Sequence, residues 1–305
     1  MTIPLDPSAQ RAARRLRDVV EPLAASVYFA PEVHAAFEAL GFGPSAGMTN
    51  GVAGPERRAY FASRAGCMGR VPGEVVASAF GVFNPAAVVP LVDQAWAITD
   101  VTTLLTARLD GQRAFLERVL ADVLAERPDD VARATGILTR MAGAGTTAGH
   151  PLYAGLRSLG FPGDAVGDLW RAADQVREHR GDSHTAAWVG AGFSAPEILL
   201  LTERWWGIPP RSYSTTRAWS SAEFDAAERR LAGLGLTDGD RLTGAGRAAR
   251  QDVETTTELQ ELPLLAAAGD DLDELLELLT PMAAAVLAAH GYPKTAFATA
   301  SDLDG

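Results

Sequence analysis

Apolar residues recur along most of the chain at the three- and four-residue spacing of amphipathic helices. The spacing predicts a first helix over 7–25 and a second from Pro31, where proline suits the first turn, to a point before Gly41. Periodic apolar positions continue over 88–96 and 104–124, whereas the alternation typical of strands is almost absent. The pattern therefore predicts a mainly α fold.

Two stretches of this helical region match one another, with one shorter loop in the second copy. Each copy has a helix, a turn that contains glycine, and a second helix that begins at proline. A duplicated helical unit often places a cavity on its pseudo-twofold axis, although weak matches of this kind also arise by coincidence. The matched positions are Leu40-Gly41-Phe42 with Leu159-Gly160-Phe161, Gly81 with Gly192, Pro85 with Pro196, and Trp96 with Trp206.

A different pattern follows Pro209-Pro210. Ser220 and Glu223 have the spacing of a capping box at the start of a helix, and Asp238-Gly239-Asp240 predicts a tight turn before another helix. Residues 272–287 form a strongly amphipathic terminal helix, which we expect to pack on the protein or on a second subunit. The predicted parts are a first helical half (1–125), a second helical half (126–208), a winged-helix-like module (209–262) and a C-terminal helix (263–305).

The module carries a family resemblance. Residues 219–254, with Leu234-Gly235-Leu236 before the turn and Leu242-Thr243 before Gly246-Arg247, resemble the recognition helix, wing and exit helix of MarR-type winged-helix proteins. Together with 60–66, Phe83-Asn84-Pro85 and 178–184, the chain resembles a family of actinobacterial helix-turn-helix proteins over nearly its whole length. The resemblance implies an architecture and a helix-turn-helix label, and it implies no activity.

Composition narrows the classes of protein. The 305 residues contain no run of eighteen apolar residues and no apolar leader, so we expect a cytoplasmic protein with no membrane partner. Cys67 is the single cysteine, which excludes an internal disulfide and a multi-cysteine metal site. The net charge of -11 argues against a broad nucleic-acid footprint.

The charge of the module points the same way. Residues 203–254 contain eight arginines and eight acidic residues, and the predicted recognition helix itself carries Glu223, Asp225 and Glu228. A neutral module binds DNA if its arginines share one face, but this balance favours dimerisation or closure of a pocket over DNA binding. A homodimer is therefore one expected assembly.

The stretch from Glu178 to His184 interrupts an apolar helical stripe over 165–176 with charged residues. Charged side chains that point at a core are costly unless they are paired or line a wet cavity, so a pocket is predicted there. On a continuous helix His179 and His184 would point about 140° apart. A break at Gly181 would bring them together, with Asp182 or Ser183 capping a new helix at His184.

In the functional interpretation His179, Asp182 and His184 are candidate catalytic residues, with a histidine acting as general acid or base or as an axial ligand to haem or a metal. No metal site is predicted from a ligand motif, and no cofactor is identified. Substrate binding is assigned to arginines that hold an anionic group and to aromatic walls of a pocket, namely Arg64, Arg180, Tyr60 and Trp188. In the structural alternative Asp182 is a helix cap and Arg180 pairs with Glu178 or a distant acid.

The motifs of P-loop kinases, Rossmann dehydrogenases, serine hydrolases and zincins are missing from the sequence. The leading hypothesis is a pocket for a small-molecule ligand, used by an enzyme of specialised metabolism. The alternative is a ligand-responsive winged-helix transcriptional regulator in which the same pocket biases the DNA-binding module. A ligand-binding protein without catalytic activity is a third possibility.

Overall fold

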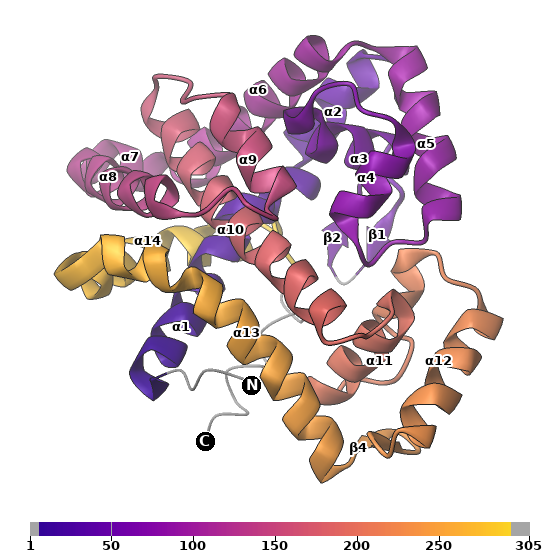
Figure 1. Cartoon of the computed structure of the whole chain (residues 1–305). Helices are drawn as coiled ribbons and strands as arrows, with labels where there is room; N and C mark the ends of the chain where they lie inside the picture. The colour runs from indigo at the N-terminus through magenta and orange to yellow at the C-terminus, as the bar shows by residue number, and fades with distance from the viewer. Residues whose placement is uncertain (1–5, 50, 294–305) are drawn as a thin grey trace.

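The computed structural model describes residues 6–49 and 51–293 (Figure 1). Over these residues the protein is mainly α, as predicted, and its strands form two short antiparallel hairpins. Residues 1–5 and 294–305, which belong to the first and last predicted parts, lie outside the described residues. The helices of the first predicted half are α1 (Pro7–Ala25), α2 (Pro31–Ala39), α3 (Arg57–Ala65), α4 (Gly73–Phe80), α5 (Pro85–Ile98), α6 (Val101–Val119) and most of α7 (Ala121–Glu126).

The remaining helices are α8 (Pro128–Ala144), α9 (Pro151–Ser158), α10 (Ala165–Gly190), α11 (Ala195–Trp205), α12 (Ser221–Gly233), α13 (Gly244–Ala268) and α14 (Leu272–Ala288). Short 3-10 helices are η1 (Ser26–Tyr28), η2 (Gly66–Met68), η3 (Ser214–Arg217) and η4 (Gly269–Asp271). The strands are β1 (Met48–Thr49), β2 (Val52–Ala53), β3 (Thr237–Asp238) and β4 (Arg241–Leu242).

Short polar side chains fix where several helices begin. Asp6 accepts a hydrogen bond from a main-chain nitrogen in the first turn of α1, which begins at the predicted position. The predicted capping box is present at α12, from Ser220 and Glu223, and a second one begins α11, from Ser194 and Glu197. These side chains satisfy N–H groups that have no partner within the helix, which is why local sequence predicts the starts so well.

Helix α10 runs without a break through Gly181, so the predicted break there is wrong. A glycine within a helix costs about 1 kcal/mol relative to alanine. That cost is offset because α10 is central and packs against α1, α8, α9 and α13. Asp182 and Ser183 consequently cap no helix at His184.

The main apolar core surrounds α10. Trp170 of α10 and Phe115 of α6 are among its largest fully buried side chains. The apolar face of α14, with Leu275 and Met282 completely buried, packs on α1 and α8, which confirms that this helix packs on the protein itself. Across the ranges that the structure describes, no helix is both long and apolar enough to span a bilayer.

The segment from α11 to α13 forms a helix, a connection, a second helix, a hairpin and a long helix. Figure 1 shows α12 and β4 at one end of the molecule, opposite α7 and α8. Close approach of the backbone requires glycine at Gly246, where a Cβ would lie 1.9 Å from the main-chain oxygen of Leu236. The predicted limit between 262 and 263 falls inside α13. The segment has a small core of its own, from Leu200, Leu201, Phe224, Ala227, Leu231 and Leu242.

The two helical halves share their turn features. Gly81 and Gly192 both have positive φ, at 58° and 78°, and Pro85 and Pro196 both lie in the first turn of the following helix. In the first half the preceding helix, α4, is a separate element, whereas its predicted counterpart over 184–191 is mostly the end of α10. The duplication stays a prediction.

Candidate functional site

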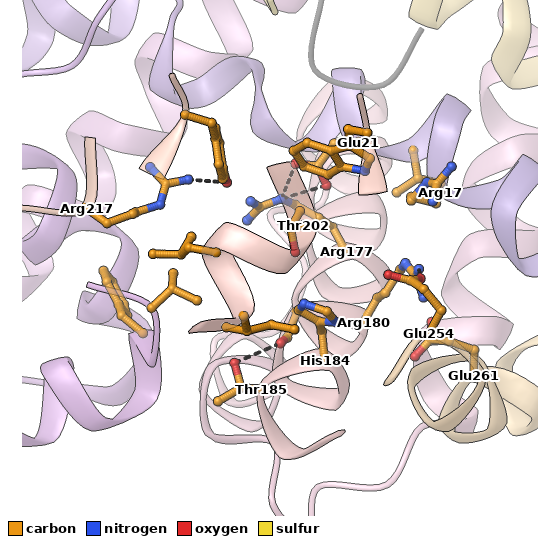
Figure 2. A pocket seen from close by; sticks show the side chains of 18 of the residues that line it. Arg17, Glu21, Arg177, Arg180, His184, Thr185, Thr202, Arg217, Glu254 and Glu261 are labelled. Carbon is orange, nitrogen blue, oxygen red and sulfur yellow. Dashed lines mark hydrogen bonds and ion pairs between the residues drawn. The ribbon is translucent and has the colours of Figure 1, made fainter. Parts of the chain in front are cut away.

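A cavity of about 270 Å³ lies between α1, α10, α11 and α13. The turn after α4 and the segment that contains η3 also contribute to its lining. Figure 2 shows Arg217 on one side of this cavity and Arg180, Glu254 and Glu261 on the other. Its volume is close to the lower end of the range for small-molecule sites, about 300 Å³. The cavity therefore joins the central helix to the segment that runs from α11 to α13.

The structure brings four of the predicted site residues to this cavity. Tyr60 and Arg64 reach it from α3, and Arg180 and His184 reach it from α10. The other three, His179, Asp182 and Trp188, are buried and are absent from its lining. The predicted pocket and its two arginines thus coincide with a cavity, whereas most of the predicted catalytic group lies behind its wall.

Guanidinium groups outnumber carboxylates around the cavity. Three glutamates belong to the lining, namely Glu21, Glu254 and Glu261. Six arginines belong to it, namely Arg17, Arg64, Arg177, Arg180, Arg217 and Arg250. Arginine presents a planar donor fork to carboxylate or phosphate oxygens, so any of these arginines that lacks an acidic partner within the protein would favour an anionic ligand.

One group of these charges is satisfied within the protein. Arg64 donates to both carboxylate oxygens of Glu178, at 2.8 and 2.7 Å, and Arg177 contacts the same carboxylate at 2.5 Å. Arg177 also pairs with Glu21 at 3.1 Å, as Figure 2 shows. Burial alone would raise the pKa of Glu178, but Arg64 and Arg177 lower that pKa to about 2. This network holds α1, α3 and α10 together as one wall.

A second group is less completely satisfied. Glu254 of α13 accepts from Arg180 at 2.9 Å and pairs with Arg250 at 2.7 Å, so Arg180 pairs with a distant acid, one of the predicted alternatives. Burial would raise the pKa of Glu254, yet Arg250 and Arg180 hold that pKa well below its usual range. One terminal nitrogen of Arg180 and one of Arg250 are buried without a hydrogen-bond partner. Arg180 and Arg250 therefore each have one nitrogen that could donate a hydrogen bond.

Arg217 of η3 differs from the other arginines of the cavity. Its guanidinium lies over the rings of Phe83 and Tyr213, 4.7 and 4.4 Å from their centroids. It donates to the hydroxyls of Tyr213 and Thr216, and its Nε is buried without a partner. Among the residues that the structure describes, it forms no ion pair with a carboxylate. Arg217 is thus a cation held by aromatic rings rather than by an acid.

Aromatic rings form the apolar part of the lining. Tyr60, Phe80 and Phe83 lie against one another, with centroid distances of 5.8 Å between Tyr60 and Phe83 and 6.1 Å between Phe80 and Phe83. Ile198 and Leu199 of α11 add aliphatic surface from the opposite element. The cavity therefore combines an apolar surface with donors fixed in position, which is typical of small-molecule sites.

His184 is the candidate catalytic residue that lines the cavity. Its Nδ1 lies 3.3 Å from the Thr257 hydroxyl of α13. Burial lowers the pKa of His184 to about 4, and the positive charge of Arg250 adds to this effect. At neutral pH the ring is therefore uncharged, and it can exchange one hydrogen bond with a ligand.

His179 and Asp182 have structural surroundings. The Nδ1 of His179 lies 2.6 Å from Glu261, and its ring stacks on His150 at a centroid distance of 4.4 Å. Asp182 accepts hydrogen bonds from the main-chain nitrogens of Leu152 and Tyr153, both at 3.0 Å, and thereby caps the start of α9. Burial raises the pKa of Asp182 to about 7. The prediction that Asp182 caps a helix beginning at His184 is therefore wrong, because Asp182 lies within α10 and accepts hydrogen bonds from the start of α9.

The sequence pattern did not predict Arg177, Arg217 and Arg250 as members of the site. Arg217 lies in the connection between α11 and α12, where no apolar periodicity indicates a direction. Arg250 lies in α13, far along the chain from the other candidates.

The described residues contain no group of three or more histidine, cysteine, aspartate or glutamate side chains that could hold a metal ion.

The outer face of α12 and the hairpin carries a different set of charges. Arg211 contacts Asp225 at 2.6 Å and Glu228 at 2.8 Å, so two of the acids of α12 are tied to a neighbouring arginine. Arg229 on α12 and Arg241 on β4 are exposed. The acidity of the helix in sequence therefore overstates the negative charge that it presents to a partner.

One comparison with known proteins identifies a family. A family model described as a helix-turn-helix family matches residues 13–293, nearly the whole chain. No curated protein and no solved structure matches the chain.

Proposed function

The chain belongs to this helix-turn-helix family, and from that premise we propose that it is a DNA-binding regulator whose affinity for DNA responds to a small molecule. The observation that carries the proposal is the order of elements from α11 to α13, in a member of that family. Two helices joined by a connection and followed by a hairpin have the order of a winged helix, with α12 as the recognition helix and β3–β4 as the wing.

The charges on this face support contact with DNA. Arg229 on α12, the proposed recognition helix, and Arg241 on β4, the proposed wing, are exposed, so both side chains can contact bases or phosphates. The pairs between Arg211 and the acids Asp225 and Glu228 reduce the repulsion that those acids would exert on phosphates. Residues 203–254 carry equal numbers of arginines and acidic residues, so the net charge of -11 comes from the rest of the chain, and DNA binding depends on the charge of the face that contacts DNA.

The cavity supports the response to a ligand. Thr202 of α11, Arg217 of η3 and Arg250 of α13 all line it, so a bound molecule would contact the proposed module directly. Arg64 and Arg177 line it from the rest of the protein. A ligand that binds one arrangement of these two parts more tightly than another would shift the balance between them and change the affinity for DNA.

Catalytic use of the cavity, the leading sequence hypothesis, has less support. His184 is the one of its three candidate catalytic residues that lines the cavity, and Asp182 is engaged as the cap of α9.

The homodimer stays a prediction. Two copies would present two recognition helices to half-sites about 34 Å apart. Analytical ultracentrifugation with and without DNA would test it.

Selection of genomic fragments by the full chain, followed by gel-shift titration at two salt concentrations, tests DNA binding. We expect one or a few fragments to bind selectively, with an affinity that falls as salt rises. Arg229→Ala should weaken binding to the selected fragment by about 1–3 kcal/mol if it contacts a base. Arg118→Ala, at an exposed arginine of α6 paired with Glu32, is the matched control and should leave binding unchanged. The absence of any selective fragment would refute the proposal.

A further inference from the structure

We infer that the cavity binds an organic anion with an apolar body, whose charged head is held by Arg217. The inference names the class of ligand for the cavity. It rests on the proposed function only for the role of ligand binding in regulation. The charge, the unused donors, the apolar lining and the size of the cavity support it independently of DNA binding.

The balance of charge leaves one arginine without a carboxylate. Arg17 pairs with Asp18, Arg64 and Arg177 share Glu178 and Glu21, and Arg180 and Arg250 share Glu254. Glu261, the third glutamate of the lining, is engaged with His179. Over the described residues Arg217 has hydroxyl and aromatic neighbours and no carboxylate partner. A ligand carboxylate, sulfonate or phosphate would supply the missing negative charge.

Arginines of the cavity lining carry nitrogen donors that have no hydrogen-bond partner. The Nε of Arg217, one terminal nitrogen of Arg250 and one of Arg180 are buried without a partner. The Arg250 side chain is only 2% exposed, so its free donor is removed from bulk solvent. A buried donor without an acceptor costs about 1–3 kcal/mol, more when it is charged. Oxygen atoms of an anionic ligand would recover that cost, with two parallel hydrogen bonds to one guanidinium.

The rest of the cavity suits an apolar body. Phe83 and Tyr60 present ring surface beside Arg217, and Ile198 lies on α11. The volume of about 270 Å³ exceeds the cavity of about 150 Å³ that holds benzene in an engineered protein. A body of one or two fused rings, or an alkyl chain of similar volume, fits this space. Inorganic phosphate alone would leave the apolar surface uncovered.

Calorimetric titration of the full chain without DNA tests the inference. The probes are 2-naphthoate, 2-naphthyl phosphate, the neutral analogue 2-naphthalenemethanol, and inorganic phosphate. We expect at least one of the two naphthyl anions to bind at least about tenfold more tightly than the neutral analogue, since a hydrogen bond to a charged group contributes about 1.5–3 kcal/mol. The stronger of the two identifies the head group as carboxylate or phosphate, and inorganic phosphate should bind weakly.

Variants locate the head group. Arg217→Gln should weaken binding of the preferred anion at least about tenfold and leave the neutral analogue unchanged, whereas Arg217→Lys should retain part of the affinity. Arg118→Gln, far along the chain on α6, should leave every affinity unchanged. Equal binding of anion and neutral analogue, no saturable binding of either naphthyl anion at millimolar concentration, or an unaffected Arg217→Gln would overturn the inference. If the full chain bound the naphthyl anion but bound no DNA fragment selectively, the proposed function would be refuted and the inference about the ligand class would stand.

Discussion

The indole nitrogen of Trp219 donates a hydrogen bond to the main-chain oxygen of Val82 at 2.8 Å. Beside it, the main-chain nitrogen of Asn84 donates to the oxygen of Arg217 at 3.0 Å. Val82 lines the cavity, and Trp219 directly precedes Ser220, the N-cap of α12. The turn after α4 is thereby connected to the start of the proposed recognition helix, which offers a route from ligand to DNA.

Trp219→Phe should weaken this connection. The change removes a hydrogen bond and replaces the indole by a smaller phenyl ring, so we expect the free energy of unfolding to fall by at least about 1 kcal/mol. The effect of a bound naphthyl anion on DNA affinity should shrink, while the affinity for the anion without DNA stays the same. Urea denaturation and fluorescence anisotropy with labelled DNA measure the two effects.

The control for this change is Trp96→Phe. Trp96 donates to the main-chain oxygen of Val71 at 3.1 Å, so the same chemistry occurs within the first helical half. Its removal should cost similar stability and leave the response to ligand intact. If Trp219→Phe kept the full response, the connection through Val82 would carry no signal.

Glu178→Gln should destabilise the protein strongly. Glu178 is buried and is shared by Arg64 and Arg177. The change leaves Arg64 without a carboxylate partner among the described residues, whereas Arg177 keeps its pair with Glu21. Breaking a buried ion pair by removing one partner costs about 3–5 kcal/mol. Glu32→Gln, which breaks the more exposed pair with Arg118, should cost less than about 1 kcal/mol. Equal losses in urea denaturation would show that the buried network contributes little.

Ala218→Gly should stabilise the protein. Ala218 has φ of 63°, in the left-handed region, where a Cβ costs about 1–2 kcal/mol. The added freedom of glycine in the unfolded chain costs about 0.4–1 kcal/mol, so we expect a net gain of up to about 1 kcal/mol. Ala226→Gly, in the middle of α12, should instead destabilise by about 1 kcal/mol. Thermal denaturation of both variants checks the opposite signs.

His184 should make stability depend on pH. Its pKa is about 4 in the folded protein and has an ordinary value of 6.5. Between these values the unfolded chain binds the proton and the folded protein does not, so stability falls as pH is lowered through this window, by at most about 1.4 kcal/mol per pH unit. His184→Asn should flatten this dependence.

Comparing the wild-type protein with His184→Asn isolates the contribution of His184 to the pH dependence of stability. Asp182, whose pKa burial raises to about 7, gives a dependence of opposite sign, and it is present in both. The difference in unfolding free energy between wild type and His184→Asn, followed from pH 7 to pH 4 by urea denaturation, is the relevant quantity. A difference that does not change with pH would contradict a depressed pKa.

Local sequence determined where helices begin and which faces are apolar. The starts of α1, α11 and α12 depend on side chains within a few residues, so capping patterns predict them. Charged residues that interrupt the apolar stripe of α10 predicted a pocket, and Arg180 and His184 do line the cavity.

Tertiary structure decided which residues that are distant in the sequence come together. Gly181 stays helical because helices distant in sequence pack on several sides of α10, and Asp182 caps α9 rather than its own chain neighbours. Arg217 and Arg250 reach the same cavity from a connection and from α13, and their free donors depend on which acids the fold brings near. Such pairings join residues far apart in the chain, and periodicity carries no information about them because it reports only which face of each helix is buried.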